Sequence, residues 1–320
     1  MDVDDFLRNE IDLGSFPGAS YAIGSVGGLE RAHALGSAVA VPLRLAANAE
    51  TIYDCASITK PLITTTLVLQ AVAEGRIALD DEYRGYTYRE LLSHASGLKA
   101  WLPLYAMGDY LRAIEEHGPE RPRGTAVIYS DLNFVLLFFA LEEIFGDYAA
   151  AARTRIFEPL GLQSSFFHPA TSLLPRIAAT EWGQRFEQGM CAARSIAFTG
   201  FRQGLMWGET NDGNSFHYGG TCGNAGLFAT ATDVFTIARA FATGVLVPLP
   251  LVQEATREQA EGRGLGWQLA FGGYGHTGFT GTSVWVIGSR VSVLLTNRVH
   301  PCAAPIAMQR IRERFHRFAT

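Results

Sequence analysis

A serine and a lysine stand three residues apart where an apolar segment begins, Ser57 and Lys60 in "TIYDCASITKPLITTTLVLQ". Lysine is rare in this chain, because 24 of its 26 basic residues are arginine and only Lys60 and Lys99 are lysine. Arginine keeps its proton in proteins, whereas lysine releases one when its surroundings lower its pKa. A serine hydroxyl needs a base beside it to attack a substrate. The pair predicts a serine nucleophile with an activating amine, although an ordinary solvated lysine would fit the same spacing.

Two later segments carry further candidate residues. The segment "PRGTAVIYSDLNFVLL" places Tyr129 and Asp131 just ahead of an apolar helix, and "GYGHTGFTGTSVWV" places His276 at the entry to a predicted strand. Each alone has an ordinary structural explanation, a core tyrosine or a loop histidine. Together with Ser57 and Lys60 they form an ordered set of residues able to transfer protons and acyl groups.

Read together, these segments resemble the serine β-lactamase and penicillin-binding-protein superfamily. The closest likeness is to the branch with class C β-lactamases, DD-peptidases and related esterases, whose ordered signatures are S-x-x-K, Y-x-N and K-T-G or H-T-G. Here they read "SITK" at 57–60, "YSD" at 129–131 and "HTG" at 276–278. Flanking phrases are also similar to the family's: "LLSHASGL" at 91–98, "RIFEPLGLQSSFF" at 155–167, "GNAGLFATATDVFTIARAFATG" at 223–244 and "LLTNRVHP" at 294–301. The likeness covers about residues 15 to 318.

The resemblance implies a role for each matching residue. Ser57 would attack a carbonyl carbon and form an acyl-enzyme. Lys60 would deprotonate the hydroxyl directly or through Tyr129, which could act as a phenolate base and return the proton to the leaving group. The backbone amides of Ser57 and Phe279 would form the oxyanion hole. Asp131, His276, Thr277 and Gly278 would contact the substrate, and the mechanism needs no metal or cofactor.

Two positions depart from the family's signatures. Asp131 stands where the Y-x-N signature has Asn, and an ionised Asp accepts hydrogen bonds but donates none. It should also repel carboxylate substrates and favour the protonated form of Lys60, which moves the base role toward Tyr129. His276 replaces the Lys of K-T-G, and a neutral His supplies no fixed cation for a substrate carboxylate. Both departures argue against a penicillin-like substrate.

The elements that must position these residues come from both ends of the chain. Residues 19–40 are apolar runs broken at Gly27-Gly28, which predicts a β-hairpin. Three β-like runs follow residue 264, two of them meeting at Gly288-Ser289, a pair suited to a type II′ turn. Residues 57–74 predict a helix buried on all sides. The helix at the C-terminus should bury one face, formed by Met308, Ile311, Phe315 and Phe318.

The predicted fold is α/β (α+β), with an antiparallel sheet built from both chain ends, flanking helices and an inserted, mostly helical domain. We assign residues 1–80 and 225–320 to the sheet domain and 81–224 to the inserted domain, with the active site in the cleft between them. This is the β-lactamase/transpeptidase-like arrangement that the resemblance implies.

Composition excludes several other classes. The net charge of −5 and the lack of a basic stripe argue against a nucleic-acid partner. No uninterrupted apolar run has the length of a membrane span, and the acidic N-terminus lacks a signal-peptide pattern, so we predict a cytoplasmic protein with no membrane partner. The four cysteines are scattered without metal-ligand spacing. The sequence carries no signal for an oligomeric state.

The sequence is compatible with three functions. The leading one is a serine hydrolase acting through an acyl-enzyme on a small ester or amide, in the manner of an esterase. The alternative is a true β-lactamase or D-Ala-D-Ala carboxypeptidase, which the charges at Asp131 and His276 disfavour. A binding protein that keeps the fold without catalysis is the third, and it would have no need for Ser57, Lys60 and Tyr129 together.

Overall fold

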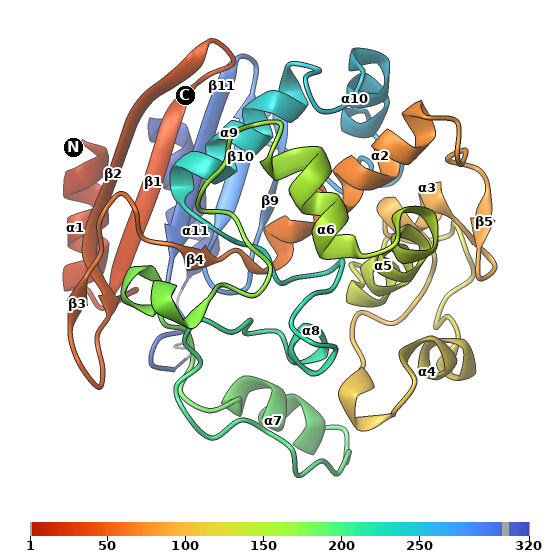
Figure 1. Ribbon diagram of the computed structural model, residues 1–320, viewed down its shortest axis with the longest axis horizontal. Coiled ribbons are helices and arrows are strands. Elements are labelled where there is room, and N and C mark those ends of the chain that lie inside the picture. Colours follow the sequence, from red (N-terminus) through yellow and green to blue (C-terminus); the bar gives the residue numbers. More distant parts are fainter. Residues whose placement is uncertain (1, 303–306, 320) are drawn as a thin grey trace.

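A seven-stranded antiparallel sheet forms the centre of the computed structural model, which describes residues 2–302 and 307–319 (Figure 1). In order across the sheet, the strands are β3 (Leu45–Ala46), β2 (Gly28–Val39), β1 (Gly18–Ser25), β11 (Arg290–Thr296), β10 (Ser283–Ile287), β9 (Gly273–Thr277) and β8 (Gln268–Ala270). Three strands come from the start of the chain and four from its end. The predicted antiparallel sheet built from both chain ends is confirmed.

The two halves of the sheet meet where β1 pairs with β11. Their register runs from Ala19 opposite Thr296 to Ser25 opposite Arg290. Both predicted hairpins are present, because β1 turns into β2 at Gly27-Gly28 and β10 turns into β11 at Gly288-Ser289. Gly288 has a φ of 57°, a left-handed conformation that glycine adopts without the steric cost of a side chain.

Helices cover both faces of the sheet (Figure 1). Helix α9 (Ala231–Ala242) packs against β1, β2, β10 and β11, and its N-cap is Thr230, whose side chain accepts a hydrogen bond from the amide of Asp233. Helices α1 (Val3–Asp12) and α11 (Met308–Phe318) cover the other face. Three residues of the predicted face of α11 are buried, but Phe318 is 40% exposed. Phe318 lies at the end of the helix, where its ring packs on Phe6.

Short helices and loops occupy the middle of the chain. Its elements are β5 (Glu82–Tyr83), β6 (Tyr86–Thr87), α3 (Tyr88–Leu92), α4 (Tyr110–His117), α5 (Asp131–Phe145), α6 (Tyr148–Ala152), α7 (Arg185–Ala192) and α8 (Gly213–His217), and α10 (Leu249–Thr256) follows α9. In Figure 1 the helices α3–α6 lie beside the sheet and α7 lies beyond its edge. The domain boundaries at 80/81 and 224/225 stay a prediction.

The predicted buried helix runs from Ala56 to Ala73 in three parts. A 3₁₀ turn (Ala56–Ile58) leads into a π-helical segment (Lys60–Thr65) and then into α2 (Thr66–Ala73). Single π-helical turns inside helices often mark functional sites. This helix is long and apolar enough to cross a membrane, which the sequence reading had not found, but 78% of it is buried inside the fold. It therefore has the character of a core helix.

Candidate active site

The chain bends sharply just before Ser57. Ala56 has a φ of 47°, a conformation that is uncommon for a residue with a side chain. The preceding β4 (Tyr53–Asp54) supplies a buried carboxylate that holds this bend: Asp54 accepts hydrogen bonds from the amide of Ala56 at 2.8 Å and from the amide of Asn211 at 2.7 Å. Burial raises the pKa of Asp54 to about 6. Asp54 thus ties the nucleophile turn to the loop before α8.

Lys60 is completely buried and lies against Ser57, as the spacing predicts. Its Nζ donates hydrogen bonds to Ser57 Oγ at 3.0 Å and to the backbone carbonyl of Asn224 at 2.9 Å. Ser57 itself is partly exposed and lines a cavity of about 440 Å³. The hydroxyl is therefore held by an amine on one side and open to a substrate on the other.

Asp131 forms an ion pair with Lys60, with 2.7 Å between Oδ1 and Nζ. Burial lowers the pKa of Lys60, but the Asp131 carboxylate and the phenol of Tyr129 outweigh burial and raise that pKa above its ordinary value. An ammonium beside a carboxylate in a buried site keeps its proton. The geometry agrees with the predicted effect of Asp at this position, which is to favour protonated Lys60.

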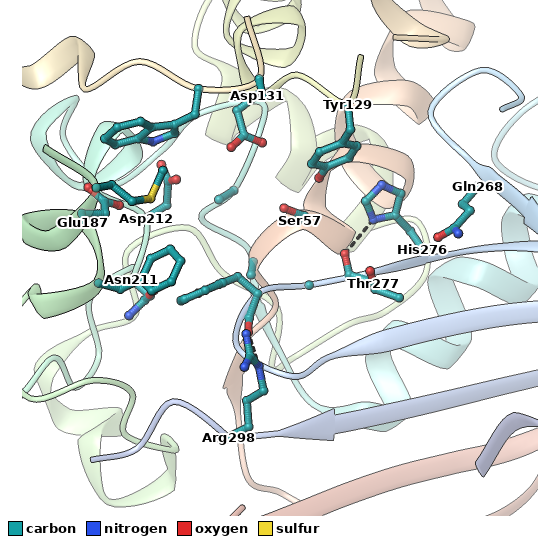
Figure 2. Close-up of a pocket in the computed structure, with 18 of the residues that line it drawn as sticks. Ser57, Tyr129, Asp131, Glu187, Asn211, Asp212, Gln268, His276, Thr277 and Arg298 are labelled. Carbon is teal, nitrogen blue, oxygen red and sulfur yellow. Dashed lines mark hydrogen bonds between the residues drawn. The ribbon is translucent and has the colours of Figure 1, made fainter. Parts of the chain in front are cut away.

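Tyr129 lies between two cations and two histidines. Its ring centroid is 5.2 Å from Lys60 Nζ and 5.2 Å from the guanidinium of Arg263. The ring also contacts His94 at 4.6 Å and His276 at 5.7 Å between centroids. Figure 2 shows the Tyr129 hydroxyl directed toward Ser57. A phenolate formed there would lie beside the nucleophile and between two positive charges.

His276 is buried at the end of β9, on the wall of the same cavity. Its Nδ1 donates to the carbonyl of Thr277 at 2.8 Å, which leaves Nε2 as an acceptor with no hydrogen-bond partner among the described residues. Burial, Arg263 and Lys60 together hold the pKa of His276 well below its ordinary value. The side chain is therefore neutral at pH 7, as the sequence analysis assumed.

Gly278 brings the end of β9 close to the nucleophile turn. A Cβ atom at this position would lie 2.1 Å from Oγ1 of Thr282 and 2.7 Å from the carbonyl oxygen of Cys55, both closer than side chains tolerate. Thr277, Gly278 and Phe279 all line the cavity with Ser57. This placement fits the predicted contribution of Phe279 to an oxyanion hole, which stays a prediction.

The chain matches the model of a known sequence family. The model described as "Beta-lactamase" matches residues 3–313, nearly the whole chain. The chain belongs to the beta-lactamase family. Its fold and its sheet-and-helix architecture are those of the serine β-lactamase and penicillin-binding-protein superfamily, and this confirms the resemblance seen in the sequence.

The chain is similar to proteins that have different names. A putative D-alanyl-D-alanine carboxypeptidase of Salmonella typhi is 28% identical over 370 aligned positions, covering 95% of this chain and 84% of that protein. The D-amino acid amidase of Ochrobactrum anthropi SV3 has a TM-score of 0.73 at 18% identity, covering 99% of this chain and 97% of that one. Simvastatin synthase of Aspergillus terreus has a TM-score of 0.74 at 17% identity, covering 99% and 96%. At these identities the two solved structures establish the fold alone.

The beta-lactamase-family site also contains residues that sequence reasoning missed. The ring of His94 packs against Tyr129, and its Nδ1 accepts a hydrogen bond from the amide of Ser130 at 3.0 Å. Its place in "LLSHASGL" was the available signal. Asp54 had a weaker signal, because only its nearness to Ser57 marked it.

Charged side chains that line the cavity were also missed. Arg263, Arg298 and Arg312 line it, as do Glu187 and Asp212. In Figure 2, Glu187 and Asp212 lie on one side of Ser57 and His276 on the other. Burial and Asp212 raise the pKa of Glu187 to about 7. The prediction against carboxylate substrates considered only the cation missing at His276, and it was therefore incomplete.

Within the described ranges, no group of three or more His, Cys, Asp or Glu side chains is arranged to hold a metal ion.

Proposed function

We propose that this protein is a serine hydrolase that forms an acyl-enzyme on Ser57 with a small ester or amide. The beta-lactamase fold implies a serine hydrolase. The observation that supports the more specific proposal is the 3.0 Å contact between Ser57 Oγ and a fully buried lysine, at the wall of a cavity of about 440 Å³. A cavity of this size suits a small-molecule substrate.

The proposed reaction has two halves. Ser57 Oγ bonds to the carbonyl carbon, and its proton passes to a Tyr129 phenolate because Lys60 already holds its own proton beside Asp131. The negative charge on the carbonyl oxygen is held by the amides of Ser57 and Phe279. Tyr129 then gives the proton to the leaving alcohol or amine as its bond to the carbonyl carbon breaks. A water molecule cleaves the acyl-enzyme by the same sequence, with Tyr129 again taking and returning a proton.

A second candidate is a carboxypeptidase or β-lactamase, whose substrates carry a carboxylate. Arg263 supports it, because this arginine lies over Tyr129, lines the cavity and has no ion-pair partner within residues 2–302 and 307–319. It could supply the cation that His276 lacks. The Salmonella relative, named as a putative D-alanyl-D-alanine carboxypeptidase, points the same way.

Turnover of three substrates tests these proposals. We expect the protein to hydrolyse p-nitrophenyl butyrate and the Ser57→Ala variant to lose at least about 10³-fold in kcat, as removal of a nucleophile does in other serine hydrolases. Ser289→Ala, in an exposed hairpin turn, is the matched control and should keep full activity. A chromogenic cephalosporin and an acyl-D-Ala-D-Ala peptide measured in parallel distinguish the two candidates. Butyrate hydrolysis that survives Ser57→Ala would contradict the mechanism.

Covalent labelling separates both enzymes from a binding protein. A fluorophosphonate should react with the hydroxyl of Ser57, and mass spectrometry of the labelled peptide would locate the adduct. Absence of label at Ser57 in folded protein would favour the binding protein.

A further inference from the structure

Two arginines from separate elements meet at the wall of the cavity beyond Phe279. Arg298 follows β11, and its Nε donates to the carbonyl of Phe279 at 2.7 Å. Arg312 lies on α11, and its Nη2 donates to the carbonyls of Gly278 at 2.6 Å and Thr282 at 3.1 Å. Both guanidinium groups therefore hold the loop that leaves β9, and both line the cavity.

Among the residues that the structure describes, neither arginine has a carboxylate partner. No ion pair joins Arg298 or Arg312 to an Asp or Glu in the part of the chain that the structure describes, and the remaining residues carry no acidic side chain. The Nε of Arg312 is buried without a hydrogen-bond partner among the described residues. Burial lowers the pKa of Arg312, and the neighbouring Arg298 lowers it further, to about 9. Two like charges held together without a counter-ion would be stabilised by an anion between them.

The contacts with the loop use only some of the hydrogen-bond donors of Arg298 and Arg312. A guanidinium has five N–H donors, and the bonds to the loop use Nε of Arg298 and Nη2 of Arg312. Backbone carbonyls could be held by uncharged donors, so the loop contacts alone do not require two adjacent cations. The free edge of a guanidinium presents parallel N–H groups that match a carboxylate.

The surroundings indicate where such a carboxylate would sit on a substrate. The ring of Phe279 lies 4.9 Å from the Arg298 guanidinium and 4.7 Å from the ring of Phe186, and both rings line the cavity. In Figure 2, Arg298 lies on the opposite side of Ser57 from Asp131 and Tyr129. The cavity that contains Ser57 therefore has both aromatic rings and the two arginines in its wall, with one of the rings packed against the Arg298 guanidinium.

We propose that Arg298 and Arg312 form a carboxylate-binding subsite, which selects substrates whose acyl chain is short, apolar and ends in a carboxylate. This proposal rests on the proposed acyl-enzyme chemistry at Ser57 and names the substrate class for it. The subsite is separate from Asp131, so the negative charge there does not oppose it. The substrate class would be monoesters or monoamides of short dicarboxylic acids.

A pair of esters matched in chain length tests the selectivity. The mono-p-nitrophenyl ester of glutaric acid and p-nitrophenyl valerate differ chiefly in the terminal carboxylate. We expect the wild type to have the higher kcat/KM for the glutarate ester, and Arg298→Gln to lower the ratio of the two values about tenfold to hundredfold, the range for a lost charged hydrogen bond. Arg298→Lys keeps the positive charge but loses the paired N–H groups of the guanidinium, so its ratio should lie between those of the wild type and Arg298→Gln. A ratio unchanged in Arg298→Gln would overturn the subsite.

Arg239→Gln is the matched control for loss of a structural arginine. Like Arg298, Arg239 donates from Nε to a backbone carbonyl, that of Val26 at 2.9 Å, but it lies on α9 and does not line the cavity. Its substitution should leave the selectivity ratio at the wild-type value. An equal fall in both variants would show that the effect of Arg298 is structural, which contradicts the proposal.

Binding without turnover separates this proposal from the proposed function. Glutarate is titrated by calorimetry into Ser57→Ala protein with and without Arg298→Gln. We expect the second substitution to weaken glutarate binding at least about tenfold. Glutarate binding that depends on Arg298 in a protein that hydrolyses neither ester would retain the subsite and reject the hydrolase. Ester hydrolysis with glutarate affinity independent of Arg298 would retain the hydrolase and reject the subsite.

Discussion

At the scale of single residues, Asp131 decides how Ser57 can be activated. The family signature has Asn at this position, and an amide there would leave the buried Lys60 free to lose its proton. Here a carboxylate lies 2.7 Å from Nζ, and the pKa of Lys60 is raised despite complete burial. Lys60 therefore serves better as a fixed cation than as a base, and Tyr129, whose hydroxyl is directed toward Ser57 in Figure 2, is the proposed acceptor of the Ser57 proton.

Asp131→Asn should change the pH dependence of ester hydrolysis. If catalysis needs protonated Lys60, then kcat/KM falls at high pH as Lys60 loses its proton. Removing the carboxylate leaves burial to lower the pKa of Lys60, so this alkaline limb should move about 1–3 pH units toward lower pH. Asp109→Asn, at the exposed N-cap of α4, should leave the profile unchanged. An alkaline limb at the same pH in Asp131→Asn would mean that Lys60 is not the group observed.

Residues that lie at a recognisable spacing along the chain could be predicted from the sequence. Residues that come together only in the folded structure could not. Ser57 and Lys60 were found because helical spacing places them on one face. Arg298 and Arg312 have no such spacing, because β11 and α11 bring them to one cavity wall only after folding. The charge balance of the cavity follows from such long-range contacts, and this is why the prediction about carboxylate substrates was incomplete.

At the scale of elements, the end of β9 and the start of the nucleophile helix must approach closely for the oxyanion hole to form. Gly278 permits this approach, since any side chain there would meet the carbonyl of Cys55. Thr282 and Thr280 strengthen it by donating to the carbonyls of Cys55 and Asp54, each at 2.8 Å. The loop that follows β9 is thus fastened to the backbone just before Ser57.

Gly278→Ala should disturb catalysis more than folding. The added methyl group would push β9 away from the nucleophile turn and displace the amide of Phe279. We expect kcat for p-nitrophenyl butyrate to fall about 10²–10³-fold, the cost of losing one oxyanion donor. The control is Gly204→Ala, where an added Cβ meets nothing within 4 Å. Wild-type kcat in a folded Gly278→Ala protein would remove Phe279 from the proposed oxyanion hole.

The elements themselves were largely predictable from local patterns. Alternation and glycine pairs located both hairpins. The division of the helix at 56–73 into 3₁₀, π and α segments was not predictable, because its apolar pattern indicates only that the helix is buried. Sequence patterns indicate which face of a helix is buried, but they do not indicate whether a segment is 3₁₀, π or α.

At the scale of the whole molecule, the segments near the two chain ends pack against each other. Strand β1 pairs with β11, and the terminal helices α1 and α11 share one apolar cluster on the outer face of the sheet. His316 is a buried residue of α11 that faces the sheet, where Ser283 of β10 and Ser292 of β11 form hydrogen bonds with its Nε2 at 2.9 Å and its Nδ1 at 2.7 Å. Burial, with Arg312 of the same helix, lowers the pKa of His316 to about 3.

His316 should therefore make the folded state sensitive to acid. An unfolded chain binds a proton at this histidine below about pH 6.5, whereas the folded chain binds one only near pH 3, so stability is full above pH 6.5 and falls as the pH decreases through this window. The loss approaches about 1.4 kcal/mol for each pH unit. Burial raises the pKa of Asp54 and of Glu187, which gives the opposite slope, but both acids remain in a variant and cancel in a comparison.

Urea unfolding of the wild type and of His316→Gln, from pH 7 down to pH 4.5, measures this contribution. Gln does not titrate. The difference in free energy of unfolding between the wild type and His316→Gln should therefore shrink steadily below pH 6.5, and by pH 4.5 it should be about 2–3 kcal/mol smaller than at pH 7. His168→Gln, at an exposed loop residue, should follow the wild type at every pH. A constant difference between wild type and His316→Gln would show that the contact between α11 and the sheet is insensitive to this proton. Acid unfolding would then have to begin at another buried group, and His94 and His276, whose pKa values are also held well below the ordinary value by burial, would be the next to substitute.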